Sequence, residues 1–136
     1  MSKLTDFRKA VNAGRKNLEK VKTISEPKTI TFFIPDAKGV GQPSELEYCL
    51  KALSVVDMYD QYSMQSTIVD DKEVDLMSSQ AAMVIVGIVD KTGKRIFSPD
   101  DAGLLDCPLN TKTILSVSMQ LMANAGVDSA GSIEVK

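Results

Sequence analysis

The sequence predicts an α+β fold that is mainly helical, with four to five helices and one or two small antiparallel β-hairpins. Apolar residues recur every three or four positions near both ends of the chain, which is typical of helices. Residues 29–34 are β-branched and aromatic and are followed by a proline, as in a strand. Ser54 and Ser98 each precede residues that favour a helix start. With 136 residues, the chain is long enough for one domain with its own core.

Residues 1–27 are predicted to form a basic amphipathic helix. Ser2 or Thr5 can cap its start, and Pro27 limits its end. Alternating spacings of three and four place an apolar seam on one side of this helix, formed by Leu4, Phe7, Val11, Gly14, Leu18 and Val21. Such a narrow seam predicts contact with a partner or with a neighbouring helix.

A strand is expected over residues 29–34, followed by a loop over 36–43 that contains Gly39 and Gly41. Residues 46–53 leave two interpretations open. Their partial alternation of apolar and polar residues favours a second, antiparallel strand, whereas the spacing of their leucines also fits a helix.

Ser54 and Asp57 match a capping box, so a helix is expected from Val55 to Thr67. Its apolar side consists of Val55, Met58, Tyr59 and Tyr62.

The acidic residues Asp70 and Asp71 suggest another helix start, because carboxylates stabilise the positive end of the helix dipole. This helix is expected to run through Val74, Met77 and Ala81. Residues 84–89 are β-branched and are either a buried helix end or a strand.

Residues 90–94 are predicted to form a turn, with a short return strand over 95–97. Ser98, Pro99 and two acids then predict a brief helix that ends before Pro108. A final helix is expected to start at Asn110 or Thr111 and to end at Gly126, and its predicted apolar face contains Ile114, Val117, Ser118, Leu121, Met122 and Ala125. The predicted organisation is therefore a helix over 1–27, a body over 28–126 and a flexible tail over 127–136.

The composition argues against a catalytic, cofactor or metal site. The chain has no histidine, which is the commonest general base and transition-metal ligand, and it has no phosphate-binding glycine motif. Cys49 and Cys107 are far apart in sequence and are expected to be reduced and buried. The acidic pairs at 70–71 and 100–101 are interpreted as helix starts rather than as metal ligands. We therefore expect no enzyme activity, no cofactor and no metal site.

The charge pattern bears on the choice of partner. A net charge of −2 gives no general attraction to nucleic acid or to a membrane, and the longest apolar run, residues 81–89, is too short to span a bilayer. The first segment has no apolar core, so it is not expected to be a signal peptide. Residues 1–28 carry a net charge of +5, and the remainder carries −7. This asymmetry suggests either a solvated basic helix or a contact with an acidic surface, including that of another copy.

One stretch resembles a known family. Residues 81–101 resemble the central segment of tail assembly chaperones from long-tailed, lambda-like bacteriophages (siphovirus type). In that family, an apolar run ends in a D-x-x-G-x-R-x-F-[ST] turn, which is followed by an acidic short helix and a leucine-rich final helix. The positions of this turn are occupied here by Asp90, Gly93, Arg95, Phe97 and Ser98. The resemblance extends over roughly residues 28–126 and does not include the basic N-terminal segment.

The resemblance implies a role in tail morphogenesis in the host cell cytoplasm. Such chaperones bind the tape measure protein, recruit tail tube subunits and are absent from the finished virion. Many also exist in a longer, frameshifted form. The two apolar helix faces are the candidate protein-binding residues: Leu4, Phe7, Val11, Leu18, Val21, Ile114, Val117, Leu121 and Met122. The opposite charges of arm and body suggest head-to-tail self-association into a ring or spiral.

Three alternatives stand beside this hypothesis. The protein could be a structural head–tail connector or tail completion subunit, which would be present in particles. It could be a small regulatory module that binds one partner in a one-to-one complex. An enzyme that uses only carboxylates is the third alternative, and a tightly bound divalent metal would favour it.

Overall fold

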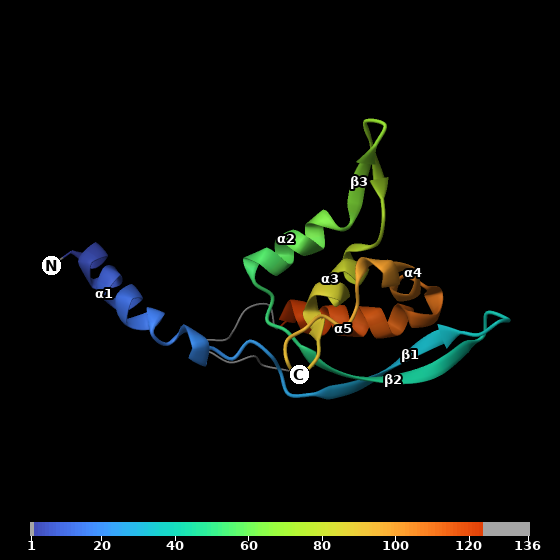
Figure 1. Cartoon of the computed structure of the whole chain (residues 1–136), viewed down its shortest axis with the longest axis horizontal. Coiled ribbons are helices and arrows are strands. Elements are labelled where there is room, and N and C mark those ends of the chain that lie inside the picture. Colours follow the sequence, from blue (N-terminus) through green and yellow to red (C-terminus); the bar gives the residue numbers. More distant parts are fainter. Residues whose placement is uncertain (1, 124–136) are drawn as a thin grey trace.

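The predicted α+β class is confirmed by the computed structural model, which describes residues 2–123 (Figure 1). Two small antiparallel sheets accompany five α-helices and three short 3-10 helices in this part of the chain. The elements in chain order are α1 (Lys3–Arg15), η1 (Leu18–Lys20), β1 (Lys28–Pro35), β2 (Gly41–Leu50), α2 (Val55–Ser63), β3 (Ser66–Val69), β4 (Lys72–Asp75), α3 (Ser79–Gly87), β5 (Ile88–Val89), η2 (Pro99–Asp101), α4 (Ala102–Leu105), η3 (Pro108–Asn110) and α5 (Thr111–Ala123).

β1 and β2 form a long antiparallel hairpin, in register from Lys28 opposite Tyr48 to Pro35 opposite Gly41. Of the two interpretations of residues 46–53, the strand is therefore correct for residues up to Leu50. The end of β2 is buried and also pairs with β5, so that β2 is the central strand of a three-stranded sheet. Pairing with β5 stabilises the strand, although the spacing of the leucines in residues 46–53 would also fit a helix.

α3 and α5 pack side by side against this sheet (Figure 1). α3 is apolar almost all round, and its residues Val84 and Val86 are fully buried. Residues 84–89 were expected to be either a helix end or a strand, and both occur: α3 ends at Gly87, and β5 follows it. Gly87 permits a close approach, since a Cβ there would be 2.6 Å from the Cδ atoms of Leu121.

The predicted helix start at Asp70 and Asp71 is wrong. These two residues form the turn between β3 and β4, and both have positive φ angles, of 51° and 62°. A two-residue turn with positive φ matches the twist of a hairpin, and Asp adopts this conformation more readily than most residues. Strands therefore occupy the region in which a helix through Val74 and Met77 was expected, and the next helix begins at Ser79, where Ser78 caps it.

Two helix lengths and one strand also differ from expectation. α2 ends at Ser63 rather than near Thr67, because the chain turns into β3. The N-terminal helix ends at Arg15, close to the weak helix formers Gly14 and Asn17. Leu18 lies in a separate 3-10 turn and Val21 beyond it, so the apolar seam does not continue along one helix. The return strand expected over 95–97 is a single bridge between Arg95 and Val89.

Apart from the predicted start at Asp70 and Asp71, the predicted helix starts are confirmed, and Ser2 caps α1. Ser54 and Asp57 form a capping box at α2, and Ser98 and Asp101 form another before α4. α5 begins at Thr111. The expectation that both cysteines are buried is confirmed for Cys49 and is wrong for Cys107, which is partly exposed; both are free thiols. The expected helix end at Gly126 and the tail over 127–136 lie outside the described residues.

Candidate protein-binding surface

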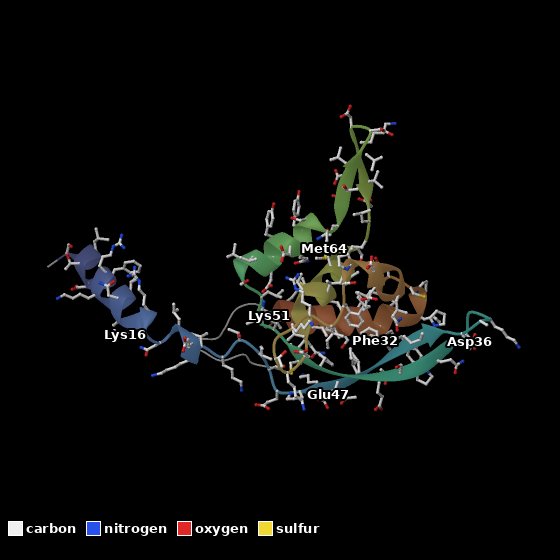
Figure 2. All side chains as sticks on the ribbon, in the orientation of Figure 1. Lys16, Phe32, Asp36, Glu47, Lys51 and Met64 are labelled. Carbon is white, nitrogen blue, oxygen red and sulfur yellow. The ribbon has the colours of Figure 1, made fainter. Side chains whose placement is uncertain are left out.

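α2 is oriented with its polar side inward and its apolar side outward. Asp57 and Gln61 are its buried residues. By contrast, Val55, Tyr59 and Tyr62 are 87%, 67% and 77% exposed, and Val56 and Met58 are exposed beside them. Side chains project from this helix away from the rest of the molecule (Figure 2). An amphipathic surface helix usually buries its apolar side, so the outer side of α2 is a candidate protein-binding surface.

Ion pairs and hydrogen bonds to Asp57 hold α2 in this orientation. The Asp57 carboxylate, 3% exposed, lies 2.9 Å from Nζ of Lys51 and 3.2 Å from Nη2 of Arg95. The same carboxylate accepts hydrogen bonds from the N–H and the hydroxyl of Ser54. Arg95 also pairs with Asp60, at 2.9 Å. Arg95 thus ties the turn to α2, and the buried carboxylate of Asp57 is paired with two cations and two hydrogen-bond donors from Ser54.

The pKa of Asp57 is lowered from its ordinary value near 3.8. Burial alone would raise this pKa, but the hydrogen bonds from Ser54 and the adjacent Lys51 outweigh the desolvation of the carboxylate. The carboxylate is therefore charged at neutral pH, and its pairs with Lys51 and Arg95 persist there.

Gln61 provides the second inward contact. Its side-chain Nε2 donates to the carbonyl oxygen of Ser79, at the start of α3. Among residues 2–123, every buried side-chain nitrogen and oxygen has a hydrogen-bond partner. Rotating α2 to bury its tyrosines would break the ion pairs and hydrogen bonds that Asp57 and Gln61 make in this orientation.

The β3–β4 hairpin continues from α2 and projects from the body (Figure 1). Ile68, Val69 and Val74 are exposed on it. Residues 66–75 include four acidic residues and one basic residue, for a net charge of −3. The outer side of α2 and this hairpin together present an apolar surface bordered by negative charge.

A second apolar surface lies between α3 and α5. It is a groove of about 320 Å³ lined by Met83, Leu115, Met119 and Met122, with Ser79, Gln80 and Ser118 contributing polar groups. Met119 and Met122 are largely exposed. Flexible methionine side chains adapt to partners of varied shape, so this groove suits an amphipathic helix.

The predicted binding residues of the final helix are mostly core residues. Ile114, Val117 and Leu121 are buried against α3 and the sheet, so they are unavailable to a partner in this fold. Met122 is exposed and lines the groove. The expectation that this apolar face meets a partner is therefore corrected to the neighbouring, Met-rich face of α5.

The predicted binding residues of the N-terminal segment are accessible. No residue of α1 is buried, and Leu4 and Phe7 are 66% and 61% exposed. Leu18 and Val21 are also exposed, whereas Val11 is partly covered. The sequence did place Val55, Met58, Tyr59 and Tyr62 on one side of a helix, but periodicity does not reveal whether that side faces the core or the solvent.

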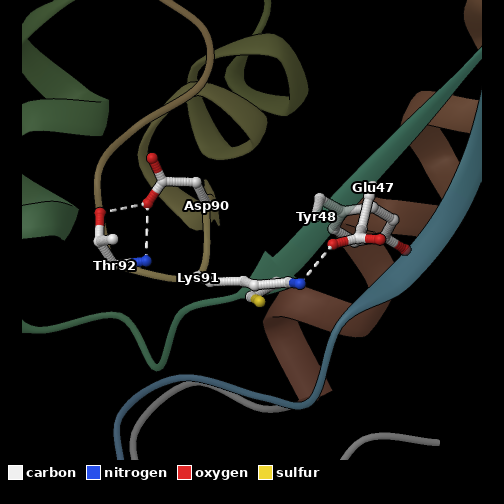
Figure 3. Close-up of a pocket in the computed structure, with 6 residues that line it drawn as sticks. Glu47, Tyr48, Asp90, Lys91 and Thr92 are labelled. Atoms are coloured by element: carbon white, nitrogen blue, oxygen red, sulfur yellow. Dashed lines mark hydrogen bonds and ion pairs between the residues drawn. The ribbon is translucent and has the colours of Figure 1, made fainter.

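A separate hollow of about 350 Å³ lies beside the turn at residues 90–94 (Figure 3). Its charged side chains already have partners: Lys91 forms an ion pair with Glu47 at 3.1 Å, and Asp90 accepts hydrogen bonds from the N–H and the hydroxyl of Thr92. Burial raises the pKa of the Cys49 thiol in its wall, which makes this thiol a weak nucleophile at neutral pH. The hollow is therefore best explained as part of the turn structure.

Residues 2–123 contain no group of three or more His, Cys, Asp or Glu side chains that could hold a metal ion. No helix of this part of the chain has the length and apolar character needed to cross a membrane.

Comparison with known proteins finds no family model, no curated protein and no solved structure that matches this chain.

Proposed function

We propose that this protein is a tail assembly chaperone of a long-tailed phage, which binds the tape measure protein and recruits tail tube subunits while associating with copies of itself. The observation that carries the proposal is the exposed, Met-lined groove between α3 and α5. A groove of this kind fits the apolar side of a long helical rod. The resemblance of residues 81–101 to such chaperones gives the proposal its specific partner.

The chemistry of the groove suits a repetitive partner. A helical rod presents similar but not identical apolar stripes along its length. Methionine side chains adjust to such variation because they are unbranched and polarizable. The serines and Gln80 at the groove can pair with polar groups beside each stripe. Binding at many equivalent places would cover the apolar surface of the rod and keep it soluble.

The experiment is co-expression with the tape measure protein encoded by the same phage. The wild-type chain is expected to raise the soluble fraction of the tape measure protein and to co-purify with it. Met119→Glu and Met122→Glu should abolish both effects, because each places a charge in the groove. Val40→Glu, at an exposed apolar residue of the β1–β2 turn, is the matched control and should behave as wild type.

Two outcomes would contradict the proposal. Insolubility of the tape measure protein in the presence of the wild-type chain would remove its central claim, and so would equal binding by the groove variants. Recovery of the protein from purified particles would instead favour a structural connector or tail completion subunit.

A further inference from the structure

The N-terminal arm is defined as residues 2–22, and the residues that follow it are tied to β2. Next to the arm, Thr23 and Ser25 pair with the end of β2: the N–H of Ala52 donates to the carbonyl oxygen of Thr23, and the N–H of Ser25 donates to that of Leu50. The Ser25 hydroxyl also accepts from the N–H of Leu50. Beyond this anchor, α1 extends away from the body (Figure 1).

A helix of this length needs a surface to pack on. Isolated helices shorter than about 12–15 residues are marginal in water, and α1 has 13 residues with none buried. Its residues Leu4, Phe7 and Val11 form one apolar stripe. Burying this stripe would stabilise the helix, so α1 is expected to find a partner surface.

The outer side of α2 matches this stripe in length and character. The stripe on α1 covers Leu4 to Val11, and that on α2 covers Val55 to Tyr62. Each spans seven residue steps, or roughly 10 Å along the helix axis. Both consist of exposed or half-exposed apolar side chains.

The charges beside the two stripes are opposite. Arg8 and Arg15 lie one helical turn after Leu4 and Val11 and therefore border the apolar stripe of α1. The arm as a whole has a net charge of +5. The β3–β4 hairpin that continues from α2 has a net charge of −3. Such complementarity favours one orientation of the two helices and speeds their association.

We propose that α1 of one copy docks on the outer side of α2 in a second copy, with its arginines toward the acidic β3–β4 hairpin. The inference rests on the self-association contained in the proposed function and names the two surfaces that produce it. A second copy is the occupant because the arm leaves its anchor directed away from its own body (Figure 1). The two surfaces differ, so the contact is head-to-tail and can be repeated from copy to copy.

Cysteine cross-linking tests this pairing directly. Phe7→Cys and Tyr59→Cys are made in separate chains, one of them carrying a size tag, with Cys107→Ser in both. Oxidation of the mixture is expected to give mainly the tagged–untagged species. Cross-links only between identical variants, or none, would overturn the proposal. A chain that carries both cysteines and closes on itself independently of concentration would also overturn it.

A charge swap tests the orientation. Arg8→Glu should weaken association roughly fivefold at low salt, as expected for an exposed ion pair of up to about 1 kcal/mol. Adding Glu73→Lys to this variant should restore association. Lys38→Glu, a matched reversal at the exposed β1–β2 turn, should leave it unchanged. Light scattering over a concentration series is the measurement.

A monomeric wild-type chain at all concentrations would overturn the inference, and so would an Arg8→Glu variant that associates like wild type. The failures of the two proposals are distinguishable. If arm cross-links are absent but the tape measure protein is still solubilised through the groove, only the α1–α2 contact is contradicted. If arm cross-links form normally but the tape measure protein stays insoluble, only the proposed partner is contradicted.

Discussion

The side-chain amide of Asn110 pairs with both main-chain groups of Phe33. The Phe33 N–H donates to Oδ1 at 2.7 Å, and Nδ2 donates to the Phe33 carbonyl oxygen at 3.0 Å. Nδ2 also donates to the carbonyl oxygen of Leu104, and Asn110 is fully buried. One side chain therefore takes the place of a neighbouring strand at the outer edge of β1 and ties that edge to α4.

Asn110→Ala is expected to lower the free energy of unfolding by about 3 kcal/mol, because it removes three hydrogen bonds made by a fully buried side chain and leaves the two main-chain groups of Phe33 without this partner. Urea denaturation measures the change. Asn12→Ala, at an exposed residue of α1, is the control and should change the value by less than about 0.5 kcal/mol. Equal stability of the two variants would show that the Asn110 contacts contribute little.

Asp57 predicts how stability depends on pH. The pKa of Asp57 is lower in the folded protein than its ordinary value near 3.8. The contribution of Asp57 to the free energy of unfolding is therefore fully present above pH 3.8, and it is lost as the pH falls through the lower pKa of the folded protein. Wild-type stability should decline in acid below about pH 4.

Asp57→Asn separates this contribution from those of other carboxylates. The variant should be less stable at pH 7, because it leaves Lys51 and Arg95 without their buried partner, and it should lose less stability on acidification. Asp36 and Asp90, whose pKa values are also lowered by hydrogen bonds within their turns, keep part of the acid dependence. Denaturant melts at pH 7, 4 and 3 provide the comparison. Parallel curves for the two proteins would contradict this role of Asp57.

Gly87 and Leu121 should show strong coupling. Gly87→Ala is expected to cost about 1–3 kcal/mol of stability, because the new methyl group would overlap the Leu121 side chain. The same change in a Leu121→Ala background should cost less, since the overlapping atoms are gone. Gly103→Ala has open space around it and should be neutral or slightly stabilising. Thermal unfolding of the four variants and wild type tests the coupling, and purely additive effects would exclude the close contact.

The tyrosines of α2 should contribute little to folding. Tyr62→Ser is expected to change the free energy of unfolding by less than about 0.5 kcal/mol, because the side chain is exposed, while weakening association of copies. Tyr48→Ser replaces the same residue type at a buried position and should cost about 3–5 kcal/mol. Chemical denaturation and light scattering give the two readouts. A large loss of stability in Tyr62→Ser would mean that α2 packs with its apolar side inward.

Local features were predictable because their interactions are between residues close in sequence. The capping boxes at Ser54 and Ser98 each join residues three positions apart. The β1 strand and the turn at 90–94 also follow from their own residues. The acidic pair at 70–71 misled because two carboxylates suit both a helix start and a turn with positive φ, and pairing between β3 and β4 decides which one forms.

The sequence by itself determined the α+β class, the starts of α1, β1, α2 and α5, and the periodic faces of the helices. Tertiary structure alone decided the direction of those faces: Ile114, Val117 and Leu121 turn into the core, while Tyr59 and Tyr62 turn outward. The physical reason is that the apolar side of a helix follows from residues three or four positions apart, whereas its burial depends on residues far along the chain. Arg95, 38 residues from Asp57, pairs with the polar side of α2, and the apolar side of this helix is exposed.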